Sequence, residues 1–267
     1  MSKKKRIMAA LSIFVLFYSF MVLGNYFLED YSSKAQTKEL IEEIEDKESL
    51  LNEEAEFPSS PNMEIPDETV SEPVMLQKYQ ELYEQNPHII GWIKIEGTKV
   101  NYPVMQNPED KEYYLNHDFN KNKNINGLPF LDARSDAEAS DILLMHGHNM
   151  KSGLIFGELI RYKEEAYYQN HSVIQFDTLY EEAEYEIVAV IISRVYYSHE
   201  KAFRYYETDK VHTENDFNSY IQNIKALSLY ETGITPLYGD KLIVLSTCEY
   251  SYENGRLAVI ARKIDNN

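Results

Sequence analysis

The feature that most limits the architecture of this chain is an uncharged run near its start. No charged residue occurs from Ile7 to Leu28. As a helix, this run would reach about 33 Å, enough to cross the hydrocarbon core of a bilayer. The basic cluster Lys3–Arg6 precedes it, and Glu29 and Asp30 follow it. By the positive-inside rule, residues 1–28 are predicted to be a single-pass membrane anchor with a cytoplasmic N-terminus and an extracellular remainder.

A cleaved signal peptide is the alternative reading of the same run, because such peptides also begin with basic residues. No convincing Ala-x-Ala cleavage site follows, and Val22-Leu23-Gly24 is a poor match. The segment also contains no cysteine to which a lipid could be attached. An uncleaved anchor is therefore favoured.

The chain is acidic, with a formal net charge of −18. A nucleic-acid-binding protein would normally carry a basic face, so that class is excluded and no nucleic-acid partner is expected. The acidity is typical of a soluble surface, although it would also favour cationic or amine-bearing partners.

Residues 29–73 are predicted to be a spacer between the anchor and a folded domain. The stretch 36–56 carries apolar residues at helical spacing, and 57–73 contains four prolines among acidic and polar residues. Such a proline-rich stretch favours an extended chain. We therefore expect the folded domain to cover residues 74–267.

Most of this domain is predicted to be β-structure. Two amphipathic helices are expected, at 75–85 and 214–227. Short runs of β-branched, aliphatic and aromatic residues predict the strands, which lie at 91–104 (two strands around a turn), 128–131, 142–145, 173–176, 185–195, 242–247 and 257–264. Strands without regular intervening helices indicate a mostly antiparallel barrel or sandwich.

Cys248 is the single cysteine of the chain, so no internal disulfide can form. A lone cysteine is often a small, inert core residue. Here, however, it ends a strongly β-forming run and precedes a polar loop, where a strand can present a side chain to a cleft. A nucleophilic cysteine also needs a base or a cation nearby to sustain its thiolate.

The candidate bases are His146 and His148, which follow an apolar run and flank Gly147. A His-x-His metal pair with Cys248 as third ligand is the alternative, but no further ligand follows closely, so no metal is expected. Arg256 opens the strand after the Cys248 loop, whose Asn254-Gly255 pair indicates a turn. Taken alone, Arg256 could equally be a solvated charge at a strand end.

Three motifs, in the right order over roughly 76–264, resemble the sortase family of cysteine transpeptidases. They are Leu245–Tyr250 (Leu-Ser-Thr-Cys-Glu-Tyr) followed by Gly255–Lys263, the segment His146–Gly157 that begins His-Gly-His-Asn-Met, and Asn86–Ile95 with Thr98–Val104. The last of these resembles the opening of class B members. A second histidine at position 146, where the family often has tyrosine, departs from the pattern.

This resemblance implies an eight-stranded β-barrel with an N-terminal helix and a helix inserted before the last two strands. It implies Cys248 as nucleophile, His148 as acid/base and Arg256 as the cation that contacts the oxyanion or positions the substrate. Ser246 and Thr247 are expected to line the substrate groove. No cofactor is implied.

The implied reaction cuts a surface protein's C-terminal sorting signal after threonine and transfers the protein to a cell-wall peptide amine. Class B resemblance favours Asn-Pro-x-Thr signals. Two alternatives stay open. One is an exported cysteine protease, although a papain-like enzyme has its cysteine before its histidine. The other is a non-catalytic surface-binding β domain with an unreactive Cys248.

Overall fold

The computed structural model describes residues 3–56 and 73–265, which fall into two compact units, one ending at Leu40 and the other beginning at Ile41. Helix α1 (Lys3–Glu56) runs through both. Its apolar part is long and hydrophobic enough to cross a membrane by length and composition. This agrees with the expected anchor, and residues 36–56 are helical as expected. The proline-rich stretch 57–72 lies outside the described residues.

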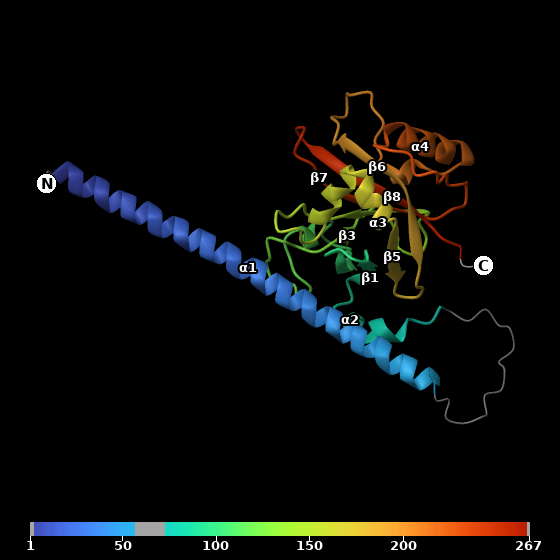
Figure 1. The fold of residues 1–267 in the computed structure, drawn as a ribbon, viewed down its shortest axis with the longest axis horizontal. Coiled ribbons are helices and arrows are strands. Elements are labelled where there is room, and N and C mark those ends of the chain that lie inside the picture. The colour runs from blue at the N-terminus through green and yellow to red at the C-terminus, as the bar shows by residue number, and fades with distance from the viewer. Residues whose placement is uncertain (1–2, 57–72, 266–267) are drawn as a thin grey trace. The chain divides into compact units, whose positions relative to one another are not determined.

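The second unit is built around a closed eight-stranded barrel with the strand order β1-β2-β3-β4-β7-β8-β6-β5. Figure 1 draws this unit as a ribbon. Its strands are β1 (Ile89–Lys94), β2 (Asn101–Met105), β3 (Phe130–Leu131), β4 (Ile142–His146), β5 (Val173–Thr178), β6 (Glu184–Arg194), β7 (Leu242–Cys248) and β8 (Gly255–Lys263). The predicted barrel and the positions of its strands are confirmed.

Two pairings in the barrel, β2 with β3 and β4 with β7, are parallel, and the other six are antiparallel. Parallel neighbours need a long crossover between them. The chain between β4 and β7 provides one, since it contains two further strands and most of the helices. The mostly antiparallel prediction therefore holds, although these two parallel pairings were not foreseen.

Both predicted helices are present, as α2 (Gln77–Gln85) and α4 (Glu214–Leu227), and α4 lies between β6 and β7 in the chain. The start of α4 is fixed by Thr213, whose hydroxyl accepts from the Asp216 amide while the Asp216 carboxylate accepts from the Thr213 amide. Such a capping box satisfies two of the otherwise unpaired donors at a helix N-terminus.

Several short helical segments were not expected from the sequence. They are α3 (Glu165–Asn170) and the 3₁₀ helices η1 (Tyr113–Leu115), η2 (Gly157–Lys163) and η3 (Thr208–Lys210).

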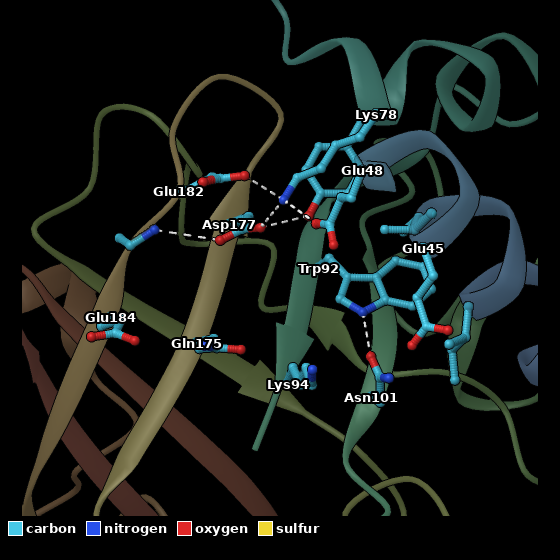
Figure 2. Close-up of a pocket in the computed structure, with 14 residues that line it drawn as sticks. Glu45, Glu48, Lys78, Trp92, Lys94, Asn101, Gln175, Asp177, Glu182 and Glu184 are labelled. Carbon is cyan, nitrogen blue, oxygen red and sulfur yellow. Dashed lines mark hydrogen bonds and ion pairs between the residues drawn. The ribbon is translucent and has the colours of Figure 1, made fainter. Parts of the chain in front are cut away.

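The buried amino group of Lys78, on α2, connects three parts of the second unit. It lies 2.8 Å from Glu48 of α1, 3.0 Å from Asp177 of β5 and 2.5 Å from Glu182 (Figure 2). Although burial opposes the charged form, these carboxylates raise the pKa of Lys78 above its ordinary value. Ile44 of α1 is also buried in this unit. The compact unit that begins at Ile41 therefore includes the last part of α1, and the start of an independently folding domain at Val74 stays a prediction.

We predict that a fragment of residues 74–267 folds, because Lys78 would lose Glu48 but keep Asp177 and Glu182. Relative to a 41–267 fragment, its free energy of unfolding should fall by roughly 2–3 kcal/mol, mainly from the lost burial of Ile44. Urea unfolding of both fragments measures this difference. Aggregation of the shorter fragment alone would show that the domain needs the last part of α1 in order to fold.

Candidate active site

The parallel pairing of β4 with β7 brings two distant segments to one edge of the barrel. Their register aligns His146 with Ser246, so both strands end at the same edge. His148 follows β4 by two residues, and Cys248 is the last residue of β7. The fold therefore brings together the histidine and cysteine motifs, which lie a hundred residues apart in the sequence.

The outer face of the sheet formed by β4, β7 and β8 is apolar at one end of the strands and polar at the other. At one end its apolar side chains pack against α4, in a cluster that includes Ile142 and Leu144 of β4, Leu242 and Val244 of β7, Ala258 and Ile260 of β8, and Phe217, Ile221 and Ile224 of α4. Because alternate residues share a face, the same face continues into His146, Ser246, Cys248 and Arg256. The candidate site thus lies on the part of this sheet face that α4 does not cover.

A cavity of about 470 Å³ lies at this edge. Every site residue expected from the sequence lines it, namely Cys248, His148, Arg256, Ser246 and Thr247, together with His146. The cavity is large enough for a segment of peptide chain.

Cys248 and Arg256 are directly opposite each other on β7 and β8. The next pair along the ladder is hydrogen-bonded, since the Glu249 amide donates to the Gly255 carbonyl at 3.0 Å. In an antiparallel ladder hydrogen-bonded and non-hydrogen-bonded pairs alternate, and side chains are closer in the latter. The Cys248 and Arg256 side chains therefore leave the sheet as close neighbours.

The turn before Arg256 is tight, as the Asn254-Gly255 pair indicated. Asn254 has a positive φ of 56°. A Cβ on Gly255 would lie 2.2 Å from the Glu249 carbonyl oxygen, so the close return of the chain requires glycine here. The Arg256 guanidinium donates to the Gly255 carbonyl at 2.9 Å.

The ring of His148 is oriented by a backbone group. Its Nε2 lies 2.8 Å from the carbonyl oxygen of Leu115, which can only accept a hydrogen bond. Nε2 therefore carries the proton in the neutral ring, which leaves Nδ1 as the basic nitrogen. A histidine held in one tautomer by a fixed acceptor is the usual arrangement of a general base.

His146 is paired differently. Its Nε2 lies 3.0 Å from Asp132, whose carboxylate is also bound by the Arg134 guanidinium at 2.8 Å. Burial alone would raise the pKa of Asp132, but hydrogen bonds from His146 and Arg134 hold it well below the ordinary value. An ionised Asp132 thus holds the His146 ring. Among residues 3–56 and 73–265, no group of three His, Cys, Asp or Glu side chains could hold a metal ion.

Ser246 and Thr247 are both almost fully buried, and their hydroxyls have protein partners. Ser246 Oγ shares a 2.7 Å hydrogen bond with the hydroxyl of Tyr205, and Thr247 Oγ1 donates to the Gly147 carbonyl at 2.8 Å. In this structure the two side chains thus support the cavity wall.

Sequence reasoning missed four residues that support the site: Leu115, Asp132, Asn149 and Tyr205. The amide of Asn149 donates to the Cys248 carbonyl at 2.8 Å. Leu115 acts through its backbone, so no side-chain signal could identify it. Asn149 stood inside the histidine motif, where its position next to His148 was the one available hint.

Comparisons with known proteins agree with this arrangement. The sortase domain model matches residues 93–264. Sortase B of Listeria monocytogenes is 33% identical over 183 residues, which cover 67% of this chain and 71% of the Listeria protein. A solved Bacillus anthracis sortase B, in complex with AAEK1, has a TM-score of 0.69 at 27% identity and covers 90% of this chain and 100% of its own.

A Staphylococcus aureus sortase B–substrate complex has a TM-score of 0.72 at 24% identity and covers 90% of this chain and 100% of its own, so it supports the fold. The family match spans more than half of the chain, and it falls on the barrel that carries the cysteine, histidine and arginine at one edge. The chain therefore belongs to the sortase family of cysteine transpeptidases, and it is a class B member.

Proposed function

We propose that this chain cleaves a C-terminal sorting signal after threonine and joins the released surface protein to a cell-wall peptide amine. Cys248 is the nucleophile, His148 the acid/base and Arg256 the cation that contacts the developing oxyanion. The observation that carries this proposal is the meeting of the three residues around one cavity, with Arg256 opposite Cys248 on the neighbouring strand.

In the first half-reaction, the Cys248 thiolate attacks the threonine carbonyl carbon and forms a C–S bond. The peptide C–N bond then breaks, and the departing amine takes a proton from His148. In the second half-reaction, the cell-wall amine attacks the thioester carbon and gives a proton to His148. The C–S bond breaks, which restores the thiolate.

The class B match favours an Asn-Pro-x-Thr signal as substrate. Ser246 and Thr247 line the same cavity, which supports the expectation that they lie against the bound peptide. Since their hydroxyls already have protein partners, we propose that they act mainly by shaping the groove.

Mass spectrometry with candidate sorting peptides and a short amine-bearing peptide tests the proposal. The full chain in detergent should produce a thioacyl adduct on Cys248 and then a transpeptidation product. Hydrolysis alone, with the amine present in excess, would instead favour an exported cysteine protease. No adduct with any peptide would favour a non-catalytic surface-binding domain.

The two neighbouring histidines should differ sharply in importance. Removing a general acid/base typically costs about 10²–10⁴-fold in rate, so His148→Ala should lose most turnover. His146→Ala should lose roughly tenfold or less, because its Nε2 is paired with Asp132. Steady-state kinetics with one sorting peptide measure both losses. A reversed order would move the acid/base role to His146.

Arg256→Lys keeps the charge but replaces a planar fork, which can hold two acceptors, with a single hydrated ammonium. Losing a transition-state donor of this kind costs about 10²–10³-fold. We expect that loss in the rate of thioacyl formation, followed by rapid-quench mass spectrometry, with an unchanged circular dichroism spectrum. Near-native acylation would reduce Arg256 to a general electrostatic role.

We further propose that the N-terminus is cytoplasmic and the barrel extracellular. The basic residues before the apolar part of α1 and the acidic residues after it support this orientation. Protease added to intact cells with a permeable wall should remove the domain and leave a short N-terminal stub. Full protection of the chain would contradict this orientation.

A further inference from the structure

The backbone pairing of β4 with β7 ends one residue before the proposed acid/base. The last backbone hydrogen bond runs from the Gly147 amide to the Ser246 carbonyl, at 3.2 Å. Beyond it the β4 chain turns away, because Asn149 pairs with Ile155 in an isolated antiparallel bridge. The backbone of His148 therefore lies outside the ladder that aligns the two segments.

The backbone carbonyl of Cys248 faces the region where the β4 chain has turned away from β7. Cys248 and Arg256 form a non-hydrogen-bonded pair, so the backbone groups of Cys248 point away from β8 and toward the β4 side. No β4 amide remains there to pair with them. The Asn149 side chain takes that place, with Nδ2 donating to the Cys248 carbonyl oxygen at 2.8 Å.

We propose that Asn149 is a positioning residue, whose amide holds the His148 segment against the Cys248 segment and so sets the separation of imidazole and thiolate. This inference rests on the proposed roles of those two residues. Asn149 itself touches no reacting atom. Its side chain supplies a hydrogen bond between the two segments where the strand backbone no longer provides one.

A second side-chain bond supports the same alignment. Thr247 Oγ1 donates to the Gly147 carbonyl at 2.8 Å, on the other side of His148. The His148 backbone is thus flanked by two cross-links from β7, one at the residue before it and one at the residue after it. Of the two, the Asn149 link alone ends on the nucleophile itself.

The far side of the His148 ring is fixed independently, because Nε2 is bound to the Leu115 carbonyl. The distance from the ring to the thiolate then depends on how closely the β4 and β7 segments approach. Misplacing a catalytic group by about 1 Å can cost 10²-fold in rate, so a single hydrogen bond at this point can govern turnover.

The test compares Asn149→Ala and Asn149→Asp with a matched control, all made in the full chain in detergent. In Asn149→Asp the shape is kept but the donor is lost. The control is Asn223→Ala, because the Asn223 amide also donates to a backbone carbonyl, that of Ser219 at 2.7 Å, on α4. Cys248 is the only cysteine, so iodoacetamide labelling reports on it alone.

Both Asn149 variants should lose about 10- to 100-fold in kcat, with KM within threefold of wild type. In Asn149→Ala the pH at which iodoacetamide labelling reaches half its maximal rate should also rise, because the thiolate loses its nearby imidazole. Asn223→Ala should match wild type in both measurements. A purely structural role for Asn149 would lower the melting temperature but leave kcat per labelled site and the labelling profile unchanged.

If it folds, as judged by circular dichroism, Asn149→Ala decides the question by kcat and by labelling, and Asn149→Asp decides it by kcat. Native kcat and a native labelling profile in a folded variant would overturn the inference. Labelling needs no sorting peptide, so it still tests the position of Asn149 if wild type transfers none. A wild-type protein that transfers no sorting peptide would count against the proposed function, not against the position of Asn149.

Discussion

The candidate active site lies at one edge of the barrel, and its assembly depends on the parallel pairing of β4 with β7. Two parallel strands end at the same edge of a sheet, so the residues that follow them meet there even though a hundred residues separate them in the chain. An antiparallel pairing of the same strands would put the histidine and cysteine motifs at opposite edges. The rest of the site is built outward from this one alignment.

The outer face of β4, β7 and β8 contributes to the core at one end of the strands and to the candidate site at the other. Its apolar half is covered by α4 and belongs to the core, and its polar half forms the cavity wall. Polar groups at the boundary must find partners as they leave water. Tyr205 with Ser246, and Thr247 with the Gly147 carbonyl, meet that requirement and hold the wall in shape at the same time.

Local patterns in the sequence were sufficient to locate the strands, α2 and α4, but not the short helices or the pairing of the strands. The apolar stripe located α4, and β-branched runs located β7 and β8, because these signals act between near neighbours. The pairing of His146 with Asp132 and the orientation of His148 by Leu115 join residues 14 and 33 positions apart. No spacing rule reaches so far, so only the folded barrel could bring these groups together.

Charged side chains of both signs line the cavity, although the chain as a whole is acidic. Two carboxylates near the site are each matched by a cation: Asp132, which lines the cavity, by Arg134, and Glu249, which follows Cys248, by Lys163 at 2.5 Å. A third carboxylate, Glu112, also lines the cavity. Burial would raise the pKa of Glu249, but hydrogen bonds from Lys163 and Ser251 lower it, so this carboxylate stays ionised and turned inward. Within residues 3–56 and 73–265 no carboxylate pairs with Arg256. Arg256 thus places a positive charge directly opposite Cys248, although the protein as a whole is anionic.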